Sequence, residues 1–277
     1  MTQRIRAGVG GWTFAPWRDN FYPAGLPHAR ELHHASRQLS AIEVNGTFYS
    51  TFKPATFAKW RDETPDGFVF ALKAHRFTTH RRELAGAGEG VQRFIASGLA
   101  ELGDKLGPIL WQLMPTTQFR PADLDAFLAL LPRELAGRPL RHVLDARHAS
   151  FACEQYLDLL QRHGCTTVYT DAPQFPALAH ARSPLAYLRL MRSQADCATG
   201  YPPEQLQAWA RGARDWVALG EKNEAFVFFI NGAKERAPAA ARAFLQLLQA
   251  AAQATPRRLG KHPRAEPPEQ PSPAPHR

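Results

Sequence analysis

The stretch RHVLDA, residues 141–146, is followed by the helical pattern CEQYLDLLQRH at 153–163 and by a second strand-like run, TTVYTD, at 166–171. The two runs have the β-branched and apolar composition of buried strands. Gly164 falls just past the helical pattern, where a left-handed C-cap favours glycine. A strand, a crossover helix and a second strand form a parallel pair, so this stretch predicts one unit of a parallel sheet.

The same alternation recurs along the whole chain. Eight runs rich in Val, Ile, Leu and Phe predict strands at 5–11, 39–45, 68–73, 109–113, 141–146, 166–171, 185–190 and 225–231. Helical patterns lie near 28–37, 54–63, 90–103, 121–132, 153–163, 203–220 and 238–252, with a short one near 174–181. Prolines at 54, 121 and 238 stand where a first helical turn tolerates them, and Gly137 stands just past a predicted helix end. Eight such units without a break in composition predict a single (β/α)8 TIM-like barrel of class α/β; an open doubly wound sheet is the alternative.

The composition changes near residue 254. Residues 254–277 hold seven prolines, few apolar side chains, and five basic against two acidic residues. Such a segment buries too little apolar surface to offset its ordering entropy, so we expect a barrel domain of residues 1–253 and a disordered tail at 254–277. The tail accounts for +3 of the formal net charge of +9, which leaves +6 on the barrel. That charge is too scattered to predict a nucleic-acid-binding protein.

The three cysteines are odd in number and show no C-x-x-C spacing. This argues against a disulfide framework or a cysteine-rich zinc site and fits a reducing compartment. No apolar run approaches the ~20 residues of a membrane span, and the N-terminus lacks a signal-peptide core. We therefore expect a cytoplasmic protein that does not associate with a membrane. Its oligomeric state is left open by the sequence.

Polar side chains stand at the C-terminal ends of the predicted strands, where the active sites of parallel barrels lie. They are Glu43, Asn45, Lys73, Gln112, Asp145, Arg147, Asp171, Tyr187, Arg189 and Asn231. Residues two apart on a strand share a face, so the strand-end pairs point the same way. Their apolar neighbours face the helices; these are Ile42, Val44, Leu144, Leu188 and Leu190. Because seven strands follow this pattern at one end, we expect a ligand site there, with His80 and His148 in loops at its rim.

The residue types favour a small anionic substrate and proton transfer. Lys73, Arg147 and Arg189 are suited to gripping a phosphate or carboxylate group. Glu43, Asp145 and His80 are the candidate catalytic residues, with Glu43 as general acid/base. The remaining polar groups are assigned to substrate binding: Asn45, Gln112, His148, Asp171, Tyr187 and Asn231. No cofactor is indicated, and the sequence leaves open whether the protein is an enzyme.

Two other functions fit parts of the same set. In a divalent-metal-dependent hydrolase or isomerase, the ligands would come from Glu43, His80, Asp145, His148 and Asp171. The nearby cations would repel the ion, and no tight spacing such as H-x-x-x-H occurs. A non-enzymatic nucleic-acid or nucleotide-binding module would use the basic run at 73–82 and aromatic residues at 12, 17 and 49. Those aromatic residues fit pocket walls or loop packing better, so nucleic acid is the less favoured partner.

Ordered motifs across the chain also carry a family resemblance. They are GVGGW (8–12) with Trp17 and FYP (21–23), EVNGTFY (43–49), FALK (70–73) with Thr79 and His80, LGPILWQ (106–112), DARH (145–148), YLR (187–189), and FIN (229–231) with Ala237. Together they resemble the YecE-like family, domain-of-unknown-function family 72, over residues 5–250. The resemblance implies a TIM-like barrel with a polar pocket at its mouth, and it implies no reaction.

This chain departs from the family pattern at several positions. Asp145 stands where glutamate is usual, and Met114 replaces a proline. Met191 and Arg192 follow Arg189 where the family has His-Gly, and Ile230 replaces the first of two asparagines. A reaction that needs the missing histidine is therefore not implied for this chain.

Overall fold

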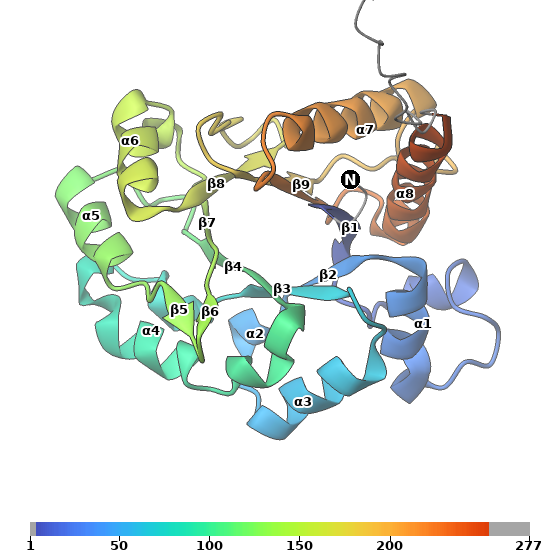
Figure 1. The fold of residues 1–277 in the computed structure, drawn as a ribbon, viewed down its shortest axis with the longest axis horizontal. Helices are drawn as coiled ribbons and strands as arrows, with labels where there is room; N and C mark the ends of the chain where they lie inside the picture. Colours follow the sequence, from blue (N-terminus) through green and yellow to red (C-terminus); the bar gives the residue numbers. More distant parts are fainter. Residues whose placement is uncertain (1–3, 255–277) are drawn as a thin grey trace, which may run out of the picture.

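The computed structural model describes residues 4–254, and eight parallel strands in it close a barrel (Figure 1). The strand order around the barrel is β1-β10-β9-β8-β7-β4-β3-β2. This confirms the TIM-like barrel and excludes the open sheet. The strands are β1 (Ile5–Gly10), β2 (Ala41–Val44), β3 (Val69–Lys73), β4 (Leu106–Gln112), β7 (His142–Asp145), β8 (Thr166–Thr170), β9 (Leu185–Leu190) and β10 (Glu224–Phe229).

Helices surround the barrel in chain order. They are α1 (Glu31–Gln38), α2 (Gly46–Tyr49), α3 (Pro54–Glu63), α4 (Gly88–Ile95), α5 (Pro121–Ala129), α6 (Glu154–His163), α7 (Pro203–Ala218) and α8 (Ala237–Ala254). Short 3-10 helices lie at Ala15–Asp19, His28–Arg30, Arg76–Thr78, Leu84–Ala87, Leu99–Lys105, Ala149–Phe151 and Lys234–Arg236. Pro54 and Pro121 open their helices as predicted, and Gly164 ends α6 at a φ of 65°.

The helix expected near 174–181 is absent. The connection from β8 to β9 runs as turns and extended chain (Figure 1). Pro176 lacks an amide for a helical hydrogen bond and disfavours helical geometry at the residue before it. Only seven residues separate it from Pro184, too few for a stable helix that has no packed face. One sector of the barrel is therefore covered by a loop.

Two other helices are shorter than predicted. The pattern at 90–103 divides into α4 and a 3-10 helix, because Gly98 between them takes a φ of 117°. The pattern at 121–132 ends at Ala129. A small hairpin follows, β5 (Glu134–Leu135) and β6 (Arg138–Pro139), so Gly137, at a φ of 74°, serves its tight turn and is not a helix cap.

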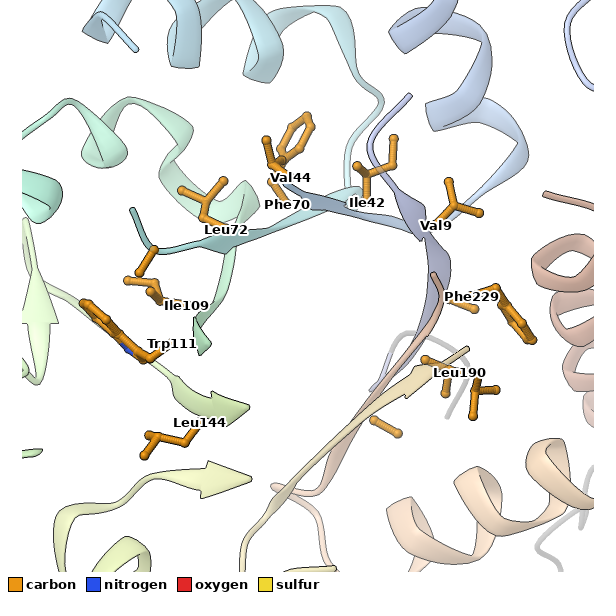
Figure 2. Close-up of a cluster of buried hydrophobic side chains, with 14 of the residues drawn as sticks. Val9, Ile42, Val44, Phe70, Leu72, Ile109, Trp111, Leu144, Leu190 and Phe229 are labelled. Carbon is orange, nitrogen blue, oxygen red and sulfur yellow. The ribbon is translucent and has the colours of Figure 1, made fainter. Parts of the chain in front are cut away.

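Side chains alternate between two apolar layers along the strands. The outer layer points away from the barrel toward the helices (Figure 2) and includes Val9, Ile42, Val44, Phe70, Leu72, Ile109, Trp111, Leu144, Leu190 and Phe229. A separate inner cluster consists of Ala41, Val69, Ala71, Leu110, Val143, Val168, Leu185, Tyr187, Phe226 and Phe228. The predicted strand faces are thus confirmed, because the polar residues that continue the inner series lie at the mouth of the barrel.

Strand β1 contributes no side chain to the part of the barrel interior next to the mouth, because its inward residues there are Gly8 and Gly10. Gly8 is needed there because a Cβ at this position would lie 1.7 Å from the backbone oxygen of Ala41. Gly10 leaves space for Asn45, whose Nδ2 would lie 2.8 Å from an added Cβ. The two glycines let β1 and β2 approach closely. The polar side chains at the mouth therefore come from the other strands.

No helix within residues 4–254 has the length and apolarity needed to cross a membrane. The tail predicted at 254–277 lies outside the described residues, apart from Ala254 at the end of α8.

Candidate functional site

The centre of the barrel mouth is an ion pair between Glu43 on β2 and Arg189 on β9, which meet across the interior. Arg189 donates from Nε to Oε2 of Glu43 at 3.0 Å and from Nη2 to Oε1 at 3.1 Å. Tyr187, two residues earlier on β9, donates its hydroxyl to Oε2 at 2.8 Å, and Asn45 donates its amide to Oε1 at 3.2 Å. Both carboxylate oxygens of Glu43 therefore already accept two hydrogen bonds each.

A second carboxylate extends this network. Asp145 ends β7, and its Oδ2 accepts from Nη1 of Arg189 at 2.6 Å. Arg147 donates to the same oxygen from Nη2 at 2.9 Å and from Nε at 3.2 Å. Arg147 also donates from Nη2 to Gln112 at 2.8 Å, because Gln112 and Asp145 are register partners on adjacent strands. All three nitrogens of Arg189 are therefore used by carboxylates.

The ionised forms of these groups stabilise one another. Burial alone would raise the pKa of Asp145, but the positive charges of Arg189, Arg147 and Lys73 outweigh it and hold that pKa below its usual value. Burial opposes the charge of Arg189 as well, and the two carboxylates nevertheless raise its pKa. The pKa of Tyr187 is raised far above its usual value by burial and by the charge of Glu43, so its hydroxyl keeps its proton.

Lys73 differs from the other cations of the mouth. It ends β3, is only 5% exposed, and its Nζ makes no hydrogen bond or ion pair with any described residue. Its nearest aromatic neighbour is Phe48, whose ring centre lies 3.9 Å from Nζ. Burial lowers the pKa of Lys73 to about 8; Arg189 and Arg147 act in the same direction, and Glu43 and Asp145 oppose them. This amine can therefore gain or lose a proton near neutral pH.

Helix α2 places Phe48 against this amine. The hydroxyl of Thr47 donates to the backbone oxygens of Val44 at 2.9 Å and of Lys73 at 2.7 Å, which fixes α2 on the ends of β2 and β3. His80 is exposed, and its ring lies 5.1 Å from the ring of Phe48. Burial, together with the charges of Lys73, Arg76 and Arg147, lowers the pKa of His80, so its imidazole is neutral at pH 7.

Three of the predicted site residues lie apart from this network. Both oxygens of Asp171 are used, by the backbone amide of Met191 at 2.6 Å and by the hydroxyl of Tyr201 at 2.9 Å. His148 caps its own turn through the backbone amide of Ser150 at 3.2 Å. Asn231 follows β10 and is exposed, because Ile230 occupies the inward position beside Gly10.

Two aromatic residues of the site were not predicted from the sequence. Phe48 lies beside Lys73, and the ring centre of Phe175 lies 4.6 Å from the guanidinium of Arg147. Phe48 falls within the EVNGTFY motif, and this motif was the sequence signal that could have indicated its place in the site. Phe175 lies in the β8–β9 connection, where the expectation of a helix hid its position.

The structure also places the residues considered for the two alternative functions. Within the described part of the chain, no three His, Cys, Asp or Glu side chains come together in a group that could hold a metal ion. Trp17 is buried and donates its indole N–H to the backbone of Lys234, and Trp12 packs edge-on against Trp60. Of the three aromatic residues considered for base stacking, Tyr49 is the exposed one, at 63%.

Known proteins resemble this chain in sequence or in fold. UPF0759 protein YecE of Escherichia coli (strain K12) is 29% identical over 188 residues, which cover 65% of this chain and 64% of that protein. UPF0759 protein YunF of Bacillus subtilis (strain 168) is 25% identical over 61% of each chain. The chain thus aligns with less than two thirds of the length of these curated relatives. A crystal structure of a DUF72 family protein from Thermotoga maritima MSB8 has a TM-score of 0.68 at 21% identity, covering 88% of this chain and 99% of that one.

The family described as "Protein of unknown function DUF72" matches residues 6–267, a range that begins at the second residue of β1 and continues past the end of α8. The resemblance found in the sequence motifs is therefore confirmed, and the chain belongs to the DUF72 family.

Proposed function

We propose that the mouth of the barrel binds a small molecule bearing a phosphate or carboxylate group and exchanges a proton with it. The observation that carries this proposal is the amine of Lys73 at the mouth: the residue is only 5% exposed, and the amine has no hydrogen-bonding partner among residues 4–254. Buried charges in proteins are normally paired or coordinated. A bound anion would supply the missing partner.

The charge balance of the network supports an anion as that partner. Glu43 and Asp145 face three cations, Lys73, Arg147 and Arg189, which leaves one excess positive charge when all are ionised. Arg189 is 2% exposed and fully engaged by the two carboxylates, so it orients them and does not grip the ligand. The nitrogens left for an anion are Nζ of Lys73 and Nη1 of Arg147, neither of which bonds to a described residue.

The proton-transfer role in this proposal belongs to Lys73. A pKa of about 8 places the amine near the value at which an acid or base works best at neutral pH. The sequence-based hypothesis gave this role to Glu43, but both Glu43 oxygens accept hydrogen bonds from charged or well-positioned donors. Each Glu43 oxygen already accepts two hydrogen bonds, which leaves this carboxylate little capacity to contact a substrate. Glu43 and Asp145 then act as positioning residues for Arg189 and Arg147.

A thermal-shift titration with inorganic phosphate and small dicarboxylates tests the proposal. A ligand that binds only the folded state at a hundredfold excess over Kd stabilises it by about 2.7 kcal/mol, which raises Tm measurably. We expect this shift in the wild type and its loss in Lys73→Met and Arg147→Met. Lys59→Met is the matched control, because Lys59 is exposed and pairs with Glu63 on α3. The shift should also decline as the pH rises through about 8, where Lys73 loses its charge.

Two results would contradict the proposal. Equal phosphate shifts in Lys73→Met and the wild type would place the anion elsewhere. Stabilisation by divalent metal ions and by no anion would favour the metal-dependent hydrolase or isomerase instead.

A further inference from the structure

A groove lies on the outside of the barrel, in the sector where the helix expected near 174–181 is absent. It has a volume of about 240 Å³ and is lined by β8, β9, α7 and the connection between β8 and β9. Elsewhere a helix covers the outward strand residues, and Leu144, for example, is fully buried. Here Tyr169 and Leu188 face outward and are only half-buried. The groove therefore leaves apolar surface that a further segment could cover.

The wall formed by α7 is shaped like a channel. Trp209 and Trp216 lie seven residues apart and so project from the same face of the helix. Gly212 stands between them, and a Cβ built on it would meet no atom within 4 Å. At 1.5 Å per residue the two indoles are ~10 Å apart along the helix axis, a little over one turn of polyproline II helix.

The groove also holds polar groups that are not paired. The indole nitrogens of Trp209 and Trp216 are buried and have no hydrogen-bond partner within residues 4–254. The same is true of both ring nitrogens of His180, a residue that is 6% exposed. Burial, and then the charge of Arg182, lowers the pKa of His180, so the ring is neutral and carries one N–H. A buried donor without an acceptor is unfavourable, so this groove favours an occupant rich in carbonyl oxygens.

We propose that the proline-rich segment after α8, residues 255–277, docks in this groove. Proline has a carbonyl oxygen but no backbone N–H, so a proline-rich strand adds acceptors without adding unpaired donors. Aromatic-lined grooves recognise such strands in their preformed polyproline II conformation. The segment contains seven prolines, at 256, 263, 267, 268, 271, 273 and 275. Part of it, up to residue 267, falls within the family match.

The start of this segment is close enough to reach the groove. Helices α7 and α8 follow neighbouring strands and lie beside each other (Figure 1). Because all the barrel strands are parallel, each of the two helices leads back from the mouth to the end where the strands begin. Ala254, the last described residue, therefore lies at the end of the barrel where Trp216 lies, about one helix diameter of ~10–12 Å away. At ~3.1 Å per residue, a polyproline strand places Pro263, Pro267 and Pro268 within reach.

A second copy of the chain is a poorer occupant for this groove. A two-fold interface would bring the same patch of both copies together. Two copies of the groove facing each other would leave the channel at Gly212 unfilled. They would also place the indole N–H groups of one copy opposite those of the other, without acceptors. The proline-rich segment fills the hollow and matches its donors with acceptors.

Limited proteolysis of the full chain tests the docking. Trypsin cleaves after Arg264, which stands between the prolines in reach of the groove. Gly212→Leu would fill the channel from a helical position with open space, whereas Ala218→Leu adds the same bulk to an exposed position of α7 and is the matched control. Cleavage tracks the undocked population when docking is fast, so we expect it to be about tenfold faster in Gly212→Leu than in the wild type and the control.

A change in the segment itself keeps the test independent of how α7 tolerates leucine. Pro267→Ser with Pro268→Ser leaves residues 4–254 unaltered, and cleavage after Arg264 should again be faster than in the wild type. Equal cleavage rates in the wild type, Gly212→Leu and the proline variant would overturn the docking. A dimer that Gly212→Leu converts to a monomer, with unchanged cleavage, would also overturn it and assign the groove to a second copy of the chain.

Discussion

Arg189 and Glu43 face each other across the barrel interior through two parallel hydrogen bonds of 3.0 and 3.1 Å. The guanidinium fork matches the carboxylate in the bidentate geometry that gives charged pairs their directionality. Because both side chains are almost fully buried, neither has water as an alternative partner. Removing one of them leaves the other as an uncompensated charge, whose cost exceeds the net value of the intact pair.

Arg189→Met should therefore destabilise the protein strongly. Breaking a buried ion pair typically costs about 3–5 kcal/mol, and here Glu43 and Asp145 both lose a donor. Urea unfolding followed by circular dichroism measures the change. Arg182→Met is the control, because Arg182 pairs with Asp158 at the surface and should contribute about 0.2–1 kcal/mol. Equal losses in the two variants would contradict the structural role of Arg189.

The pH dependence of stability should depend on Lys73. Its pKa is about 8 in the folded protein against an ordinary value of 10.5, so the unfolded chain binds this proton more tightly. Between about pH 8 and 10.5 the unfolded state holds more protons at this group, and the contribution of Lys73 to stability becomes more favourable as pH rises. Below about pH 8 the folded state carries the full cost of the buried charge.

Lys73→Met removes this dependence. The variant should be more stable than the wild type at pH 7, and the difference should shrink as the pH approaches 10.5. Urea unfolding at several pH values, with Lys59→Met as the exposed control, measures it. Parallel pH profiles for the wild type and Lys73→Met would show that Lys73 does not carry a buried charge.

Gly8→Ala should destabilise the barrel, because the added Cβ would lie 1.7 Å from the backbone oxygen of Ala41 and only a shift of β1 or β2 can relieve it. We expect a loss of roughly 3 kcal/mol, the upper range for overpacking. Gly212→Ala is the matched control and should stabilise the protein. Its Cβ meets no atom within 4 Å, and alanine favours a helix over glycine by ~0.5–1 kcal/mol. Thermal unfolding of both variants measures the contrast, and a stable Gly8→Ala protein would refute the close approach of β1 and β2.

The sequence alone determined the barrel and the faces of its strands. A period of two along each strand separates Glu43 from Ile42 and Val44, and Asp145 from Leu144, so side chains of opposite polarity must face opposite layers. Parallel strands in a closed barrel end at one rim, and the polar residues of different strands consequently meet there. Neither inference requires knowledge of distances.

Tertiary structure decided which of the rim residues act together. The alternation along a strand predicts the direction of a side chain only within that strand. Beyond the strand ends the tertiary structure decides: Asn45 and Arg147 join the network, whereas Asp171 bonds to Met191 and Tyr201 and Asn231 is exposed. Composition cannot say that all three guanidinium nitrogens of Arg189 donate to two carboxylates while the amine of Lys73 donates to no described residue, because that depends on distances across the barrel. The sequence shows which charged residues are present. Which of them pair depends on the positions of β2, β3, β7 and β9 around the barrel.

The β8–β9 connection shows that the local sequence also left one element of secondary structure undecided. Residues 177–181 are apolar apart from His180 and are compatible with a helix, but Pro176 and Pro184 leave too few residues between them for one to form without tertiary support. Whether a sector of the barrel is covered by a helix or by a loop is a property of packing against β8, β9 and α7. The groove at Trp209 and Trp216 follows from that packing, since side chains far apart in the sequence line it together.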